Sequence, residues 1–227
     1  MTSAQRIKVN DPPSQPLALE GLLEKVAVAA PDIERLSEWS ETQGQLHEET
    51  IALLEAIGVP RLFLPRDLGG WEVSPGICAQ VCEAIADADP AAAWHVMVYN
   101  SARLMASTWP LETVEQLWLG QADTLVAASG HTPLQGTAMA DGSYRVSGRN
   151  SFVSGVHHAD YVLSPMICGG AMCSVLLRRE QLHIEDDWDT QGMRGTGSNS
   201  ISVDNVLVTP DRVIQPVEPA ERNRSTV

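Results

Sequence analysis

YRVSGRNSFVSGVHHAD, residues 144–160, runs from a strand-like segment into a loop of small and polar residues. The tripeptide Asp141-Gly142-Ser143 comes just before it and follows a second strand-like run at residues 137–140. A short polar turn with a central glycine between two such runs is typical of a β-hairpin. The sequence therefore predicts β-structure in this part of the chain.

Phe152, Ser154 and Gly155 lie in the second half of this stretch. Phe152 and Ser154 are separated by one residue, so on a strand their side chains would face the same way. An aromatic face can lie against a planar ring, a nearby hydroxyl can meet a polar edge of that ring, and a glycine permits close approach of the backbone. A second interpretation stays open, in which Phe152 is a core residue and Ser154 a hydroxyl at the end of a strand.

The chain around the hairpin continues in a β pattern. Further strands are predicted at residues 124–128, 161–166, 172–177, 183–185 and 200–208, and the last of these alternates between apolar and polar residues. Together with the hairpin, they predict a small antiparallel β-barrel or sandwich over residues 123–214. A polar tail follows at residues 215–227.

The chain before residue 123 has helical periodicity instead. Helices are predicted at residues 17–29, 32–41, 47–57, 75–88, 91–107 and 110–119. Pro31 is expected to open the second helix and Ser74 to cap the fourth, while Gly58 and Gly120 suit helix ends. The expected fold class is therefore α+β: a disordered lead at residues 1–16, an all-helical N-terminal domain at 17–122, and then the β-domain.

Composition and charge narrow the classes of partner. The chain has 227 residues and a formal net charge of −14, which repels a phosphate backbone and argues against nucleic acid. There is no apolar run of the ~20 residues that a membrane helix needs, and no secretory signal, so no membrane association and a cytoplasmic location are expected. The four cysteines are expected to be reduced thiols, and adjacent His157 and His158 would face opposite ways on a strand, so no metal is expected.

Three stretches in this order resemble the acyl-CoA dehydrogenase superfamily: LFLPRDLGG at residues 62–70, the stretch at 144–160, and WDTQGMRGTGSNSISVDN at 188–205, continued by VLVTPDR at 206–212. ADADPAAAWHV at 86–96 joins the first two. The resemblance is closest to the two-component, reduced-flavin-dependent monooxygenases that hydroxylate 4-hydroxyphenylacetate and steroid phenols. It runs from roughly residue 20 to residue 214 and implies only the N-terminal and middle domains of that fold, without the family's C-terminal helical bundle.

The resemblance implies a flavin site on the β-domain. In the family, the segment that matches residues 152–155 lies against the isoalloxazine, with the position of Ser154 near flavin N5. The loop SGHTP at residues 129–133 matches one that offers backbone groups to the pyrimidine edge. The cofactor-binding residues implied in these two segments are Ser129, Gly130, His131, Thr132, Phe152, Val153, Ser154 and Gly155, with Ser154 also assigned a catalytic position.

Residues 193–198, MRGTGS, place two glycines and two hydroxyl side chains after an arginine. Such a segment could cradle an anion through backbone donors, and Arg194 could pair with a flavin phosphate, either its own or a neighbouring subunit's. The spacing is not that of a nucleotide-binding P-loop. A structural turn before the last strand is an equal alternative.

The helix predicted at residues 91–107 is apolar enough to be buried on most sides. Trp94 and His95 near its start, with Tyr99 and Asn100 further along, are the candidates for the substrate pocket. Related monooxygenases often carry a histidine near the later position, and this chain does not. Ordinary core packing of Trp94 is an equal alternative.

The leading hypothesis from the resemblance is the oxygenase component of a two-component monooxygenase. Reduced FMN or FAD would diffuse from a flavin reductase, react with oxygen to a C4a-hydroperoxide that Ser154 helps to stabilise, and hydroxylate an aromatic or similar small substrate. The protein would be a homo-oligomer, or would bind a chain that supplies the C-terminal bundle. The alternatives are an acyl-CoA dehydrogenase-like desaturase and a truncated or split non-catalytic paralogue that acts as an assembly partner.

Overall fold

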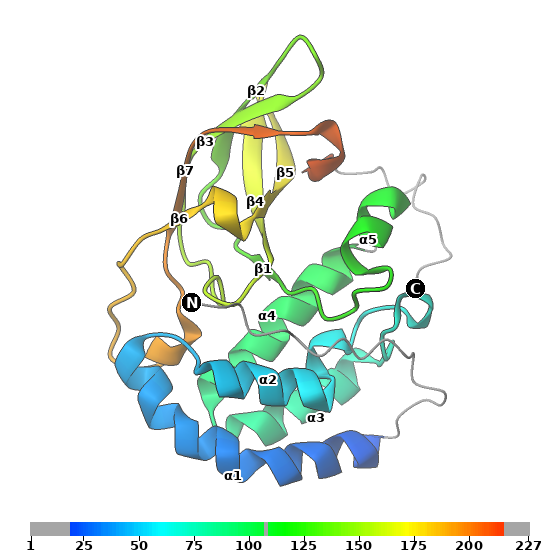
Figure 1. Ribbon diagram of the computed structural model, residues 1–227, viewed down its shortest axis with the longest axis vertical. Coiled ribbons are helices and arrows are strands. Elements are labelled where there is room, and N and C mark those ends of the chain that lie inside the picture. The colour runs from blue at the N-terminus through cyan, green and yellow to red at the C-terminus, as the bar shows by residue number, and fades with distance from the viewer. Residues whose placement is uncertain (1–18, 107–108, 216–227) are drawn as a thin grey trace.

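The computed structural model describes residues 19–106 and 109–215, in which helices come first and strands follow (Figure 1). The helices are α1 (Leu19–Gln43), α2 (Glu48–Ile57), α3 (Pro75–Ala86), α4 (Pro90–Ala106) and α5 (Leu111–Trp118). The predicted α+β fold class, helical first and then β, is confirmed. The lead at 1–16 and all but the first residue of the tail lie outside the described residues, and the division into two domains stays a prediction.

α1 is one helix where the sequence pattern predicted two. Pro31 lies inside α1, so the prediction that it opens a new helix was wrong. A proline inside a helix removes one backbone hydrogen bond and costs about 3 kcal/mol. Burial of one continuous stripe against α2 and α3 offsets that cost, since each buried aliphatic side chain contributes about 1.5–3 kcal/mol. The buried stripe of α1 consists of Leu22, Val26, Ala29, Ile33, Leu36 and Ser40.

The caps predicted for the next two helices are confirmed. Gly58 ends α2 in the left-handed conformation, with φ +89°, and its N–H donates to the carbonyls of Leu54 and Glu55. The hydroxyl of Ser74 accepts a hydrogen bond from the N–H of Ile77 at the start of α3. Local capping chemistry therefore decides where these helices begin and end.

The strands form one mixed sheet rather than a purely antiparallel one. Their order is β6-β7-β3-β2-β4-β5-β8, with β1 also paired to β4. The hairpin predicted around residues 141–143 is confirmed as β2–β3, but β4 pairs in parallel with both β1 and β2. The strands are β1 (Val126–Ala128), β2 (Leu134–Ala138), β3 (Tyr144–Asn150), β4 (Tyr161–Cys168), β5 (Ala171–Arg178), β6 (His183–Ile184), β7 (Ile201–Val208) and β8 (Val213–Ile214).

β1 and β2 follow one another along the same edge of β4, which explains the parallel pairings. Ala128 is paired with Leu163, and Leu134 is paired with Met166. More residues therefore separate the two short strands than separate their partners on β4. The extra residues between the two strands, 129–133, form a loop that leaves the edge of β4 after β1 and returns to it at β2.

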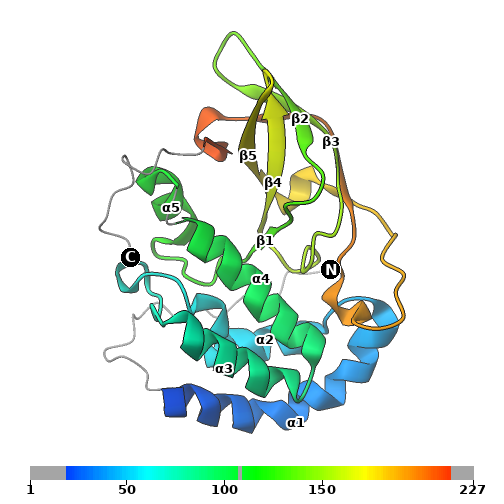
Figure 2. The ribbon, with the colours of Figure 1, turned by 180° about the vertical axis from the view of Figure 1, so that it is seen from behind.

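The helical and β parts share a buried core. α4 lies between the sheet and helices α1 to α3 (Figure 2) and contacts β1 as well as α3. Leu125, Val153 and Ile201 are buried in the same cluster as the apolar stripes of α1 to α4. A second cluster lies within the sheet itself, among side chains of β2, β3, β4, β5, β7 and β8. α4 therefore connects the two halves of the molecule.

Across the described ranges, no helix is both long enough and apolar enough to cross a membrane. In that same part of the chain no three His, Cys, Asp or Glu side chains gather as metal ligands. His157 and His158 have different partners: the Nε2 of His157 lies 2.8 Å from the Oδ1 of Asn199, and the Nε2 of His158 lies 3.0 Å from the carbonyl of Leu46. Both rings are thus held by protein groups.

Candidate functional site

Phe152 displays its ring on the surface, where 53% of the residue is exposed. Its backbone φ is +61°, a left-handed conformation that costs a bulky L-residue about 1–2 kcal/mol. β3 ends at Asn150, so Phe152 and Ser154 lie in a loop, and Ser154 is buried. The prediction that the two side chains face the same way on a strand was wrong, and so was the alternative of Phe152 as a core residue.

Two further rings lie beside Phe152 and define an aromatic cluster with it. The ring of His131 is 4.9 Å from that of Phe152 and the ring of Trp188 is 6.3 Å from it, both edge to face. The indole N–H of Trp188 is shielded from solvent and has no hydrogen-bond partner within the described residues. Three separate loops thus bring one aromatic ring each to the same place.

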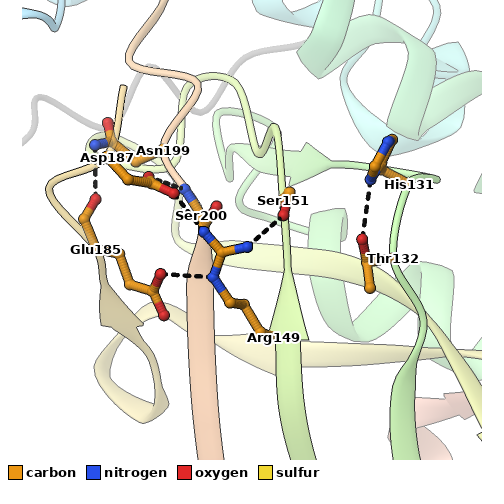
Figure 3. Close-up of polar contacts among 8 residues, drawn as sticks. All are labelled: His131, Thr132, Arg149, Ser151, Glu185, Asp187, Asn199 and Ser200. Carbon is orange, nitrogen blue, oxygen red and sulfur yellow. Dashed lines mark hydrogen bonds and ion pairs between the residues drawn. The ribbon is translucent and has the colours of Figure 1, made fainter. Parts of the chain in front are cut away.

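Trp188 was not among the predicted site residues, although it opens the third stretch of resemblance. Its loop is held by Arg149 at the end of β3 (Figure 3). The Nε of Arg149 donates to Glu185 over 2.6 Å, and its other nitrogens donate to Asp187 and to the hydroxyl of Ser151. Pairing with Glu185 raises the pKa of Arg149. The contacts of Arg149 with Glu185 and Asp187 depend on how β7 pairs with β3 and β6, which the sequence alone does not give.

The loop at residues 129–133 is tied to the start of the Phe152 segment. The hydroxyl of Ser129 donates to the carbonyl of Ser151 over 2.6 Å. The buried amide of Asn150 accepts from the N–H of Thr132 over 3.2 Å and donates to the carbonyl of Ser129. The Thr132 N–H predicted to meet a ligand is therefore already used by Asn150, a residue that the sequence analysis missed.

Gly130 and His131 of this loop face outward. A Cβ added to Gly130 would meet no atom within 4 Å, so the surface above it is open. The ring of His131 is exposed, and its Nδ1 lies 2.9 Å from the hydroxyl of Thr132 (Figure 3). The side of the loop that carries Gly130 and His131 is thus accessible to a ligand.

Ser154 belongs to a chain of hydrogen bonds that links α4 to residues 193–198. The indole N–H of Trp94 donates to the hydroxyl of Ser154 over 3.0 Å. The hydroxyls of Ser154 and Ser198 are 2.7 Å apart, and those of Ser198 and Thr196 are 2.8 Å apart. The hydroxyl of Thr196 donates to the carbonyl of Met193 over 2.8 Å. We call these four side chains, with the carbonyl of Met193, the hydroxyl chain.

The MRGTGS segment, predicted as an anion cradle or a structural turn, holds an anion that belongs to the chain itself. The carboxylate of Glu41, in the last turn of α1, accepts the backbone N–H groups of Arg194 and Gly195 at 2.9 and 3.3 Å. The guanidinium of Arg194 donates to the carbonyl of Glu41 and to Asp189. These contacts favour the structural turn, and a phosphate would have to share Arg194 with them.

The predicted substrate-pocket residues separate into two groups. Trp94 is 42% exposed, whereas His95, Tyr99 and Asn100 are buried. Asn100 donates to the carbonyls of Val59 and Val96 and accepts the N–H of Phe63. These buried contacts show that Asn100 fixes α4 to the connector that follows α2, and its place in a substrate pocket stays a prediction.

His95 and Tyr99 pack against the loop that carries Ser154, and their place in a substrate pocket stays a prediction. The hydroxyl of Tyr99 donates to the carbonyl of Gly155 over 2.9 Å, and burial lowers the pKa of His95 to about 4. Gly155 has φ +75°, and a Cβ there would lie 2.8 Å from the Tyr99 hydroxyl and 3.0 Å from the His95 ring. The glycine is required by packing against α4, while the sequence analysis had assigned it to ligand approach.

Comparisons with known proteins agree with this architecture. No protein-family model matches the chain. It is 33% identical over 198 residues to indole-3-acetate monooxygenase of Pseudomonas putida, an alignment covering 84% of the chain and 49% of that protein. It is 25% identical over 197 residues to the flavin-dependent monooxygenase oxygenase subunit HsaA of Rhodococcus jostii, covering 85% and 51%. The chain thus spans about half the length of the curated relatives it matches.

Solved structures give the same result. The 3-HSA hydroxylase of Rhodococcus sp. RHA1 superposes with a TM-score of 0.77 at 25% identity, over 86% of this chain and 51% of that one. XiaF of Streptomyces sp., solved with FADH2 and glycerol, shares the fold with a TM-score of 0.82 at 22% identity, over 87% of this chain and 51% of that one.

The architecture is therefore the acyl-CoA dehydrogenase fold, as the resemblance implied. Within that fold, the relatives and structural neighbours named above are flavin-dependent monooxygenases and their oxygenase components, and the chain is similar to about half the length of each.

Proposed function

We propose that the chain is part of the oxygenase component of a two-component flavin-dependent monooxygenase, and that the aromatic cluster with Ser154 holds the flavin ring. One observation carries this proposal: Phe152 keeps a strained backbone and exposes its ring between two others. Such strain persists where the surrounding structure imposes it, and it is concentrated at ligand sites. A planar ligand would gain from the exposed ring, while the core gains nothing from it.

An isoalloxazine fits the groups that this surface offers. It is planar, with apolar faces and an edge of carbonyl oxygens and ring nitrogens. Phe152 would pack against a face of the ring. The open surface at Gly130 leaves room for the ring beside the loop. Ser154 would meet the flavin near N5, as the resemblance implies.

When bound, a reduced flavin supplies the electrons with which one atom of O₂ enters an aromatic or similar small substrate and the other leaves as water. The work of the protein is to bind, orient and shield the reacting groups. Two exposed aromatic residues are connected to Ser154. Trp94 donates a hydrogen bond to its hydroxyl, and Phe152 lies two residues before it in the chain. They would provide the apolar surface that keeps water from the hydroxyl.

Reduced FMN or FAD would come from a separate flavin reductase. Support comes from relatives named as oxygenase components, among them the FADH2-dependent resorcinol hydroxylase of a Rhizobium strain, which is 31% identical over 173 residues. Structural neighbours solved with FADH2 and with FMN add to this support. A cytoplasmic location, where reductase and reduced flavin would meet, is part of the proposal.

The outer face of α4 would be covered by a protein partner, either a second copy of the chain or a chain that supplies the helical bundle. Trp94, Leu104 and Met105 lie on α4 and are 42%, 54% and 46% exposed. An exposed apolar patch of this kind favours association. The division into a helical domain at residues 17–122 and a β-domain at 123–214 belongs to the same proposal, with α4 at the junction.

Anaerobic titration of the full chain with reduced and oxidised FMN and FAD, followed by tryptophan fluorescence, tests the flavin site. Binding is expected for the wild type and should weaken by roughly tenfold in Phe152→Ala, the effect of losing one aromatic contact. Trp39→Ala is the control, because Trp39 is an exposed aromatic residue on α1. A chain that binds no flavin would contradict the proposal and favour an assembly partner.

A further inference from the structure

The hydroxyl chain has a direction that its two ends impose. At one end, the indole N–H of Trp94 can only donate, so the oxygen of Ser154 must accept. At the other end, the carbonyl of Met193 can only accept, so the single proton of Thr196 must point to it. Three hydroxyls lie between these ends, each with one proton to donate.

Only one arrangement of protons satisfies every contact. Because Thr196 gives its proton to Met193, the short contact with Ser198 is a hydrogen bond only if Ser198 donates to Thr196. The contact of Ser198 with Ser154 then requires Ser154 to donate to Ser198. In the reverse arrangement, oxygen lone pairs would face each other at 2.8 Å between Thr196 and Met193.

Ser154 is consequently left with no proton to offer. Its hydroxyl donates to Ser198 and accepts from Trp94, which leaves one lone pair of the oxygen unused. A small part of the residue, 7%, remains exposed. Any ligand group that meets this oxygen must be a hydrogen-bond donor.

We propose that the hydroxyl chain fixes Ser154 as an acceptor toward the ligand and that the site thereby selects reduced over oxidised flavin. This inference rests on the proposed function, in which Ser154 meets flavin N5. N5 carries a hydrogen in the reduced ring and a lone pair in the oxidised ring. The reduced ring forms a hydrogen bond with Ser154, whereas the oxidised ring sets one lone pair against another.

Ser198 and Thr196 are positioning residues in this account, since they act on the ligand through Ser154. Both are buried, at 6% and 2% exposure, so neither needs to touch the flavin. An oxygenase component gains from such selection, because oxidised flavin released after turnover would otherwise compete with the reduced flavin delivered by a reductase.

Ser198→Ala tests the direction of the hydroxyl chain while keeping the bond from Thr196 to Met193. Without Ser198 as acceptor, Ser154 can turn its proton toward oxidised N5. The ratio of the affinity for reduced FMN to that for oxidised FMN should fall by roughly tenfold, the scale of one mismatched hydrogen bond. The midpoint potential of bound FMN should fall by about 30 mV for each tenfold fall in this ratio, as for any two-electron couple.

Three variants serve as comparisons. Thr196→Val should lower the ratio as Ser198→Ala does, since Ser198 can then donate to Ser154. Thr196→Ser keeps the hydroxyl and should keep the wild-type ratio. Ser202→Ala removes a β7 hydroxyl outside the hydroxyl chain and should change nothing. A modified flavin gives a further comparison. Oxidised 5-deaza-FMN has a C–H in place of N5 and therefore no lone pair to face the Ser154 oxygen. The wild type should bind it more tightly than it binds oxidised FMN.

The possible results separate the inference from the function on which it rests. If the wild type binds FMN but Ser198→Ala and Thr196→Val both keep its affinity ratio and midpoint potential, the direction of the hydroxyl chain does not select the redox state, and this inference is overturned while the flavin site stands. If the wild type binds neither form, the flavin site itself is wrong and the inference falls with it.

Discussion

The inner face of α4 and the aromatic cluster use polar and aromatic side chains in opposite ways. Tyr99 and Asn100 on the inner face are buried, and their polar atoms form hydrogen bonds with backbone groups of other segments. Phe152 and Trp188 in the cluster show an exposed, strained ring and an N–H without a partner in the described chain. The polar groups of the inner face hold the fold together, while the exposed ring of Phe152 is available to a ligand.

Asn100→Ala should have the largest effect on stability, because it removes a buried side chain that bonds three backbone groups, among them the N–H of Phe63 and the carbonyl of Val59 outside α4. We expect a loss of about 4 kcal/mol in the free energy of unfolding, from unsatisfied groups and a small cavity. Ser101→Ala, next to it and bonded within its own helix, should cost less than about 1 kcal/mol. Urea titrations of both variants measure the difference, and equal costs would remove Asn100 from the scaffold.

Gly155→Ala should disturb the contact between α4 and the Ser154 loop. An alanine there is strained at φ +75° and would press on Tyr99 and His95, which should cost about 2 kcal/mol. Gly130→Ala is the matched control, since nothing lies near its added Cβ. Thermal unfolding of the two variants compares the scaffold with the open surface, and equal melting temperatures would show that the loop tolerates displacement from α4.

The histidines packed at the inner face should make the fold sensitive to acid. Burial lowers the pKa of His95 to about 4 and that of His158 to about 3. The unfolded chain, with histidine pKa values of about 6.5, then binds protons that the folded chain rejects. Stability is therefore full above about pH 6.5 and falls as the pH drops toward 4, by about 1.4 kcal/mol per pH unit for each histidine.

Urea unfolding between pH 7 and 5 measures this slope. Burial also lowers the pKa of His157, so its contribution has the same sign. His95→Gln should reduce the slope by the share of one histidine. A slope identical to that of the wild type would mean that His95 is protonated in the folded protein, contrary to its burial.

Phe152→Gly should have the smallest effect on stability and should still impair flavin binding. Glycine adopts the left-handed backbone freely, so this variant should be more stable than Phe152→Ala by about 1 kcal/mol, the usual difference at such a position. Both variants should bind reduced FMN roughly tenfold more weakly than the wild type. If Phe152→Gly unfolds more easily than Phe152→Ala, the positive φ is not a strain that the fold imposes.

Local chemistry made much of the fold predictable. Ser74 and Gly58 cap helices through contacts with their own neighbours, and the turn at residues 141–143 needs only its own sequence. Pro31 could not be read in this way, because the packing of α1 against α2 and α3 outweighs a local helix breaker. The parallel pairings of β4 were also missed. The alternation of apolar and polar residues within a short strand does not indicate whether the strand pairs in parallel or antiparallel.

The candidate site was harder to predict than the fold. Phe152 and Ser154 were identified from their chemistry and the family resemblance, but their relative orientation depends on a positive φ that side-chain alternation does not anticipate. Trp188 lies beside Phe152 in a loop that is held by residues distant in the sequence, through the ion pairs of Arg149 and hydrogen bonds to Asn199 and Ser200. Arg194 was predicted to be available to a phosphate. The sequence does not reveal its partner Glu41, because that residue lies on another element, far away along the chain.

A crystal structure of the chain with reduced FMN, grown without oxygen, tests the central claim most directly. The account predicts the isoalloxazine against Phe152, with N5 at hydrogen-bonding distance from the hydroxyl of Ser154. A flavin seated away from the aromatic cluster, or one whose N5 contacts a group other than Ser154, would contradict it.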